Sequence, residues 1–450
     1  KIVEKRPASR EMGGICQQNW CGSEIGGQTN CNLMVCRCTG DNLCLEVMEI
    51  PTGNNPISYA DPPQWCEVGG NRLRLVRVPS VRLAALIDLL ESAQNSLKLF
   101  FYMFEDDRTG RQILDILVAA CDRGVKVEMM IDSFGSNGAP RKFFAPLIEA
   151  GGKFKVFSPN FSSSYFVRNH QKMIIADDGC ALIGGFNIAD EYFSVHRQNE
   201  TGDSTDDSWE DLGLEIAGPE VRNLANYYRL LSDWVYRDNG NIRSLQKMVR
   251  DWEAGDGQFR WLLGGPSNRL SRWARAIKND LENASRLDLV SAYFSPGQGL
   301  LRRIAKISKR GGKIRIILPG ETDNAATIGA SRLLYGYLLK RHARIFEYQP
   351  RRLHTKLVIV DDAVYVGSAN FDLRSLFINV EIMLRIEDAG FARHASGVID
   401  ALHEDSQAIT PDLHKSRRSF LNRLRWIISY FFVNTLDYSV TRRLNFGIKK

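Results

Sequence analysis

The chain has no apolar run close to the roughly 20 residues that a membrane-spanning helix needs, and no secretory signal pattern. The sequence begins at Lys1 rather than Met, so it does not exclude a membrane anchor that precedes Lys1. Neither low complexity nor extreme charge is present: 44% of the 450 residues are hydrophobic and 25% are charged, which excludes a disordered or fibrous chain. Because this length exceeds one ordinary core, we expect two domains or lobes.

Cysteine is almost absent after residue 66. Only Cys121 and Cys180 occur there, in apolar settings typical of plain core residues. The other seven cysteines lie in residues 1–67, with no histidine among them. Their spacing leaves three alternatives open: a zinc site built from Cys16, Cys21, Cys31 and Cys36, disulfides, or unligated thiols. We expect residues 1–67 to form a separate appendage.

Acidic residues are scarce at the other end. From His414 to Lys450 there are nine Lys or Arg residues and one acid, so the remainder of the chain is close to neutral. These charges bracket the apolar and aromatic stretch WIISYFFV, residues 426–433. The pattern predicts either a helix lying in an anionic lipid interface, or a last helix packed on the protein with solvated arginines. We treat residues 413–450 as a basic, aromatic tail.

The body of the chain repeats itself. Residues 96–104, 111–124 and 125–132 read as strand, helix and strand, and residues 286–294, 299–312 and 313–320 give the same order. Two βαβ units imply parallel strands covered by helices. We therefore expect lobes at 68–225 and 263–412, joined by a linker at 226–262.

Each lobe ends in a segment of the form His-x-Lys. The first, HQKMIIADDGCALIGGFN, starts at His170, and the second, HTKLVIVDDAVYVGSANFD, starts at His354. Residues two apart share one face of a strand, so each histidine points the same way as its lysine, Lys172 or Lys356. Taken singly, either segment is best explained as a strand with a structural histidine. Two matched copies predict instead a shared site between the lobes.

The residue types suit a tetrahedral anion. Two lysines and two asparagines, Asn187 and Asn370, would hold non-bridging phosphate oxygens, while one imidazole attacks phosphorus and the other protonates the leaving oxygen. Because the lysines supply the positive charge, we expect catalysis without a metal or other cofactor.

These two segments resemble the paired H-x-K-x4-D motifs of the phospholipase D superfamily, and the similarity extends over residues 68–436. The stretch NFDLRSLFINVEI, residues 370–382, is similar to the one that follows the second motif in bacterial cardiolipin synthases. The resemblance implies an α/β fold of two duplicated lobes, each a mixed, mostly parallel sheet flanked by helices, with the active site at the lobe interface.

The resemblance also implies roles for individual residues. His170 is expected to be the nucleophile, oriented by Asp211, and His354 the general acid and base, oriented by Glu381. Asp177 and Asp361, which end the two motifs, are expected to stabilise the turn and the lobe contact.

The implied reaction transfers a phosphatidyl group from one phosphatidylglycerol to another, giving cardiolipin and glycerol. The expected partners are phosphatidylglycerol and an anionic membrane surface, with no nucleic acid. The expected location is the bacterial cell membrane, by peripheral attachment or an anchor. A phospholipase D that uses water as acceptor, or another phosphodiesterase of the superfamily, remains an alternative.

Overall fold

A computed structural model describes residues 64–158, 167–193, 208–237, 241–255, 257–266, 270–322 and 325–436, and the backbone of four short strands elsewhere. The chain divides into two compact units, residues 1–60 and 61–450. In the first unit, β1 (Val35–Thr39) and β2 (Asn42–Glu46) form an antiparallel pair. Cys16, Cys21 and Cys31 lie outside the described residues, and only the backbone of Cys36 is described, so the three alternatives for the cysteines stand as before.

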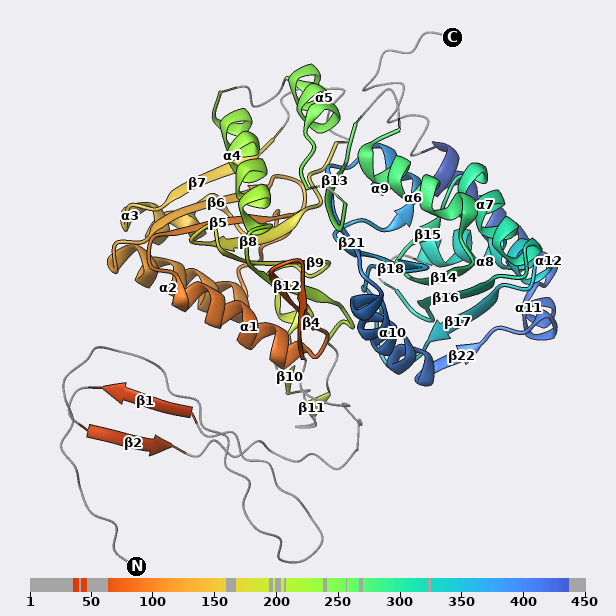
Figure 1. The fold of residues 1–450 in the computed structure, drawn as a ribbon, viewed down its shortest axis with the longest axis horizontal. Coiled ribbons are helices and arrows are strands. Elements are labelled where there is room, and N and C mark those ends of the chain that lie inside the picture. Colours follow the sequence, from red (N-terminus) through yellow and green to blue (C-terminus); the bar gives the residue numbers. More distant parts are fainter. Residues whose placement is uncertain are drawn as a thin grey trace, which may run out of the picture. The chain divides into compact units, whose positions relative to one another are not determined.

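The second unit contains two eight-stranded sheets, one for each predicted lobe (Figure 1). The order in the first sheet is β3 (Trp65–Val68), β4 (Asn71–Val76), β12 (Gly213–Ala217), β9 (Cys180–Gly184), β8 (Lys172–Ala176), β5 (Ser96–Phe101), β6 (Lys126–Asp132) and β7 (Lys153–Phe157). The order in the second is β13 (Phe259–Gly264), β21 (Glu381–Glu387), β19 (Ala363–Gly367), β18 (Leu357–Val360), β14 (Arg286–Val290), β16 (Lys313–Pro319), β17 (Arg344–Tyr348) and β22 (Ser406–Ala408). The predicted duplication is confirmed.

The sheets are mixed, but the expected predominance of parallel pairs is wrong. In each sheet only the βαβ strands and the strand that follows them are parallel, β5–β6–β7 and β14–β16–β17. Each His-x-Lys strand folds back as a hairpin, β8 with β9 and β18 with β19, and a hairpin is antiparallel by construction.

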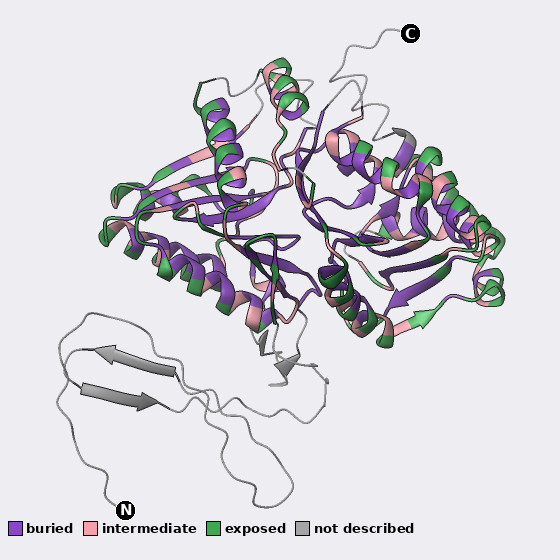
Figure 2. Ribbon diagram, viewed as in Figure 1, coloured by how far each residue is buried: buried purple, intermediate pink, exposed green. Residues whose placement is uncertain are grey.

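The helices divide between the faces of the sheets. In the first lobe α1 (Pro79–Ser92), α2 (Arg108–Asp122) and α3 (Ala145–Glu149) cover one face, and in the second α6 (Arg272–Asn283), α7 (Gln298–Lys309) and α8 (Ala325–Leu339) do so (Figure 1). The opposite faces share one large core with α4 (Val221–Arg237) and α10 (Ala389–Glu404). Figure 2 shows the buried strands between these layers. The remaining helices are α5 (Ile242–Asp251), α9 (Leu373–Phe377), α11 (Pro411–Arg417) and α12 (Phe420–Tyr430).

Local sequence explains where the repeated helices end. After α2 and α7 the chain turns sharply through Gly124 and Gly311, whose φ angles are 88° and 82°. Glycine adopts this left-handed conformation without the steric cost of a Cβ atom. A buried strand then begins within two residues of each glycine, β6 and β16. The predicted strand, helix and strand are thus confirmed in both copies.

The lobe boundaries differ from those expected. β3 lies within the expected appendage, yet it pairs with β4 in the first sheet. The expected linker contains most of α4, whose Tyr227 and Tyr228 are fully buried, and the first strand of the second sheet, β13. Consequently the stretch at 226–262 is part of the shared core, because its apolar side chains pack against both sheets.

Candidate active site

The two histidines lie immediately before equivalent strands. His170 precedes β8 and His354 precedes β18, and each strand is buried along its whole length at the centre of its sheet. Lys172 and Lys356 are also buried, with 1% and 2% of their surface exposed. The side chain of His170 is 13% exposed and that of His354 is 7% exposed. The motifs therefore place four basic groups in the interior of the protein.

Backbone hydrogen bonds join each histidine segment to the opposite lobe. The amide of His170 donates to the carbonyl oxygen of Val380 over 2.8 Å, and the amide of Val380 donates to Arg168 over 2.9 Å. The second lobe repeats this arrangement: the amide of His354 donates to Glu210 over 2.7 Å, and that of Glu210 donates to Arg352 over 2.9 Å. Each pair forms a short parallel β-bridge, so two such bridges fix the register between the lobes.

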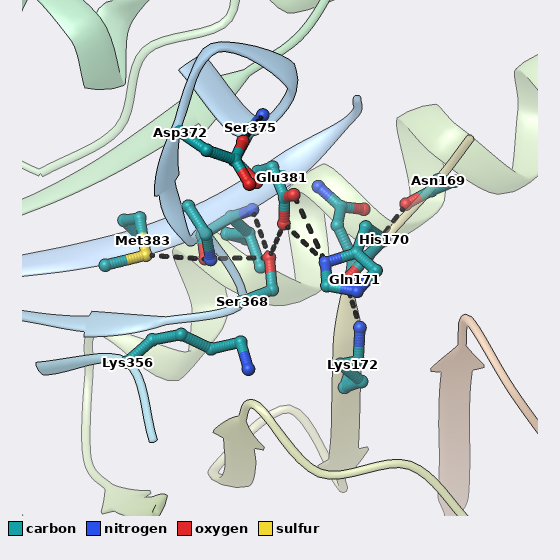
Figure 3. A network of polar contacts seen from close by, with 12 residues as sticks. Asn169, His170, Gln171, Lys172, Lys356, Ser368, Asp372, Ser375, Glu381 and Met383 are labelled. Carbon is teal, nitrogen blue, oxygen red and sulfur yellow. Dashed lines mark hydrogen bonds and ion pairs between the residues drawn. The ribbon is translucent and has the colours of Figure 1, made fainter. Parts of the chain in front are cut away.

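Each bridge sets which carboxylate meets which histidine. Glu381 follows Val380, and its carboxylate lies 3.2 Å from Nδ1 of His170 (Figure 3). Asp211 follows Glu210, and its Oδ2 lies 2.7 Å from Nδ1 of His354. The expected pairing, Asp211 with His170 and Glu381 with His354, is therefore wrong. Each carboxylate crosses the interface because the bridge aligns it with the other lobe's histidine.

The two carboxylates have different surroundings. A Cβ atom on Gly185 would lie 2.4 Å from Oδ1 of Asp211 and 2.9 Å from Cδ of Lys356, so only glycine leaves room for both side chains. At the equivalent position in the second lobe, Ser368 donates its hydroxyl to Oε2 of Glu381 over 2.5 Å. The hydroxyl also accepts the amide of Ile382 over 3.0 Å. Both carboxylates are fully buried.

The positive groups act on one another. Burial lowers the pKa of His170 well below its usual value, and Lys172, Lys356, His354 and Arg168 lower it further. The two interface bridges, and the approach of Lys356 to Gly185 of the first lobe, bring both histidines and both lysines to one site. Figure 3 shows Lys172 and Lys356 pointing toward the same region beside His170.

The two histidines differ in their electrostatic environment. Burial and Lys356 lower the pKa of His354 to about 4, while Asp211 opposes this shift. Lys356 and His354 hold the pKa of Asp211 below its usual value in spite of burial, so this carboxylate stays ionised. Burial instead raises the pKa of Glu381 to about 8. His354 thus has an ionised partner, whereas His170 has a partner that titrates near neutral pH.

The lysines are held by the histidine backbone. Lys172 Nζ donates to the carbonyl oxygen of His170 over 2.6 Å, and Lys356 Nζ donates to that of His354. Because ionised Asp211 can only accept, the Nδ1 proton of His354 belongs to that contact, which leaves Nε2 free for chemistry. Burial also lowers the pKa of Lys172 well below its usual value, so an anionic ligand would stabilise the protonated form of this lysine.

The two asparagines are not equivalent. Asn187 accepts the amide of Met103 over 3.1 Å and donates to the hydroxyl of Tyr192 over 2.9 Å. Both polar atoms of its side chain thus have protein partners. Oδ1 of Asn370 is buried without a hydrogen-bond partner among the described residues. A buried amide with an unused polar atom is suited to a ligand, so Asn370 is the stronger candidate.

The motif aspartates act within their own lobes. Asp177 accepts the amides of Gln94, Asn95 and Ser96 at 2.7–2.8 Å, and Asp361 accepts those of Ser285 and Arg286. Both adopt positive φ, 52° and 51°, which aspartate tolerates better than most residues. They therefore fasten the start of β5 and of β14 to the hairpin turns. The expected part in the lobe contact is wrong, because these turns lie at the far ends of the strands.

Sequence reasoning missed several supporting residues. Asp132, at the end of β6, accepts the amides of Asn169, Phe134 and Gly135 and so fixes the segment that leads to His170. Burial raises the pKa of Asp132 to about 6. Fully buried Arg82 donates to the carbonyl oxygen of Asp211 over 2.6 Å. An aspartate ending an apolar strand was a usable signal, but nothing around Arg82 in the sequence marks it.

Aromatic rings border both histidines. The Tyr102 ring lies 4.8 Å from that of His170, measured between centroids, and Tyr192 and Trp209 lie 5.4 Å and 5.2 Å from His354. Within the described residues, no group of three His, Cys, Asp or Glu side chains is arranged to hold a metal ion. In the same part of the chain, no helix combines the length and apolar character that crossing a membrane requires.

Comparison with known proteins agrees with this architecture. A family model described as "Cardiolipin synthase, PLD-like domain" matches residues 86–209 and 277–402, once in each lobe and over more than half of the chain. The chain belongs to this phospholipase D-like family. The resemblance seen in the two motifs is thereby confirmed, and with it the expected class of enzyme, a phosphatidyltransferase of the cardiolipin synthase type.

Individual relatives cover most of the chain. It is 27% identical to cardiolipin synthase B of Shigella flexneri, covering 82% of this chain and 89% of that protein. It is 26% identical to cardiolipin synthase A of Pseudomonas aeruginosa, and the match covers 78% of this chain and 71% of that protein. Among solved structures, phosphatidylserine synthase of Haemophilus influenzae superposes with a TM-score of 0.65 at 16% identity, over 82% of this chain and 95% of that one. This last similarity concerns the fold alone.

The first prediction concerns the close contact at Gly185. We expect Gly185→Ala to displace Asp211 and Lys356, and to lower the rate of phosphodiester turnover by roughly 10- to 100-fold, the cost of a small misplacement of catalytic groups. Gly179→Ala is the matched control, because the nearest atom to a Cβ there is 3.8 Å away. Turnover and melting temperature are measured for both. Equal rates in the two variants would contradict the role given to this contact.

The second prediction concerns Glu381. Its pKa in the folded protein is about 8, above the usual 4.5, so the folded state binds the proton more tightly than the unfolded state does. The free energy of unfolding therefore falls as the pH rises from about 4.5 to about 8. We expect Glu381→Gln to raise the melting temperature at about pH 9 and to change it little at about pH 5. Turnover should fall, because the glutamine cannot ionise.

The control for this variant is Glu387→Gln, at the exposed end of the same strand. An exposed ion pair contributes little to stability, so this variant should melt like the parent at both pH values. If Glu381→Gln also melts like the parent in alkali, burial does not raise the pKa of this carboxyl.

Proposed function

We propose that the protein transfers a phosphatidyl group from one phosphatidylglycerol to another, releasing glycerol and forming cardiolipin, through a phosphohistidine intermediate. The observation that carries this proposal is the pair of histidines at the lobe interface, each with Nδ1 held by a buried carboxylate of the other lobe, in a chain of the cardiolipin synthase family. The lysines provide the positive charge for the phosphate, so the mechanism uses no metal or other cofactor.

In the first half-reaction Nε2 of His170 attacks phosphorus, and the bond between phosphorus and the headgroup glycerol oxygen breaks. His354 gives its proton to that oxygen, and glycerol leaves. In the second, His354 removes a proton from a hydroxyl of another phosphatidylglycerol. That oxygen attacks phosphorus, the bond between nitrogen and phosphorus breaks, and cardiolipin forms. Lys172, Lys356 and Asn370 bind the non-bridging oxygens.

The surroundings of the histidines support this division of roles. A proton donor must be an imidazolium, and at His354 ionised Asp211 favours that form against the opposing effects of burial and Lys356. The phosphate of a bound lipid would raise the pKa of His354 back from about 4, because its negative charge offsets the lysine charges. At His170 burial, and after it the positive charges of Lys172 and Lys356, keep the imidazole neutral and nucleophilic. The roles match those expected from the sequence, although the carboxylates are exchanged.

The substrate fixes the proposed location. Both phosphatidylglycerol and cardiolipin are anionic lipids that remain in the bilayer, so the enzyme works at an anionic membrane surface. We place the protein at the bacterial cell membrane, attached peripherally or by an anchor.

The third prediction tests the reaction. Phosphatidylglycerol labelled in its headgroup glycerol, supplied as the only lipid in mixed micelles, should yield cardiolipin and free labelled glycerol in equal amounts. Phosphatidic acid as the only lipid product would show that water is the acceptor and would identify a hydrolase. Double replacement of His170 and His354 by alanine provides the blank.

The fourth prediction separates the two histidines. With a phosphodiester that carries a nitrophenolate leaving group, no proton donor is needed for the first step. His354→Ala should therefore accumulate phosphorylated enzyme after a burst of nitrophenolate, while His170→Ala should accumulate none. The intermediate is detected by mass spectrometry under alkaline conditions, because phosphohistidine is labile in acid.

The control is His394→Ala on α10, which removes an imidazole outside the site. It should turn over like the parent. Phosphate found on His354 in the His170→Ala variant would reverse the proposed roles and leave the two-histidine mechanism in place.

A further inference from the structure

The helix α12 exposes apolar side chains that a globular protein would bury. Phe420 and Leu421 are 81% and 75% exposed, and five more large apolar residues are about half exposed. These are Leu424, Ile427, Ile428, Phe431 and Phe432. They recur at intervals of three and four residues, so they form one continuous stripe along the helix and its extension to Leu436. We call this stripe the apolar face.

Tertiary contacts fix the direction of the apolar face. On the other side of α12, Trp426 and Ser429 are buried against α8, where Gly329 leaves no room for a Cβ atom beneath Ser429. His414 stacks on Trp426 with ring planes 17° apart. The helix already buries one side, and the apolar face is held outward on a rigid support. The expected alternative, a helix packed on the protein, is therefore correct for one side of α12 only.

Beside the apolar face lies a cationic cavity of about 370 Å³. Arg332, Arg417 and Arg425 line it, together with Asn422 and Trp426. Arg332 and Arg417 both bond to the single carboxylate of Glu347, and Arg425 forms no ion pair among the described residues. Two of the three lining guanidinium groups thus share one carboxylate and the third adds a further positive charge, so the lining has a net positive charge that suits a phosphate.

The surrounding sequence has one sign of charge. Residues 413–436 contain five Lys or Arg residues and no acid. A second copy of the chain would not suit this surface, because a two-fold interface places the same patch against itself and would bring these cations together. Apolar side chains next to arginines match instead the interface of an anionic bilayer, with acyl chains below and phosphates above.

We propose that the apolar face and the cationic cavity form a docking site for an anionic phospholipid bilayer. The apolar side chains insert at the boundary of headgroups and acyl chains, and the cavity binds the phosphate of one lipid outside the catalytic site. The proposal rests on the proposed function only in supposing that the protein meets phospholipids as a membrane. It assigns to α12 the recruitment of the enzyme to the surface that contains its substrate.

The test measures binding apart from catalysis. The full chain is sedimented with vesicles of phosphatidylcholine alone, or of phosphatidylcholine with phosphatidylglycerol. We expect binding to the anionic vesicles, stronger at low salt. The triple variant Leu421→Ser, Leu424→Ser and Ile428→Ser should bind about tenfold more weakly or worse. Arg425→Glu should weaken binding to anionic vesicles several-fold and leave the zwitterionic result unchanged.

Two matched variants serve as controls. Leu230→Ser removes an exposed leucine from α4, and Arg393→Glu reverses an exposed arginine on α10. Both should bind vesicles like the parent. All the substituted side chains are exposed, so melting temperatures should agree, and a variant that melts lower is replaced by its single substitutions. Unchanged binding by the triple variant overturns the proposal.

Two further measurements distinguish the docking site from the proposed function and from a dimer interface. The triple variant and Arg425→Glu should form cardiolipin at the parent rate in mixed micelles and more slowly than the parent on vesicles. A parent protein that makes no cardiolipin in micelles, yet binds anionic vesicles through α12, refutes the proposed function and not the docking site. Light scattering of the lipid-free protein completes the test: a dimer that the triple variant dissociates means that a second copy covers the apolar face, and this also overturns the proposal.

Discussion

Two backbone bridges between the lobes are the constraint on which the site depends. Each bridge consists of two hydrogen bonds and joins the segment ahead of one motif histidine to the residue ahead of the other lobe's carboxylate. A shift of one residue in either bridge would turn the carboxylate away from the imidazole, because neighbouring side chains on an extended strand point to opposite sides. The lobes therefore cannot separate or slide without breaking both histidine–carboxylate pairs, so the candidate site belongs to the interface rather than to either lobe.

Duplication has left the two halves of the site similar in backbone and different in chemistry. In one half a glycine admits a short, ionised aspartate, and in the other a serine hydroxyl supports a longer glutamate whose pKa lies near 8. A symmetric pair would give both histidines the same proton affinity. A reaction that needs a nucleophile and a proton donor at the same moment benefits from the difference, since two environments assign two roles. Burial of Lys172, Lys356 and His354 makes the site favour an anionic ligand.

The same lobe that provides one histidine also supports α12. The helix packs on α8 in the outer layer of the second sheet, so the proposed docking surface and the candidate site are parts of the same compact unit. An enzyme whose proposed lipid substrates and lipid product stay in the membrane, while glycerol leaves, has to hold its site at a defined position above the lipid. A rigid amphipathic helix with a phosphate-sized cationic cavity can provide that position without crossing the bilayer.

The sequence by itself determined the duplication, the hairpins that follow both His-x-Lys motifs and the identity of the basic site residues, because strand periodicity and turn chemistry act over a few neighbouring residues. It did not determine the carboxylate pairing, the predominance of antiparallel strands or the place of residues 226–262 in the shared core. These depend on contacts between residues far apart in the chain: His170 meets Glu381 across 211 positions only when both lobes have folded and docked. The orientation of α12 has the same origin, since its apolar stripe would by itself be expected to face the protein, and the packing of Trp426 and Ser429 against Gly329 turns it outward.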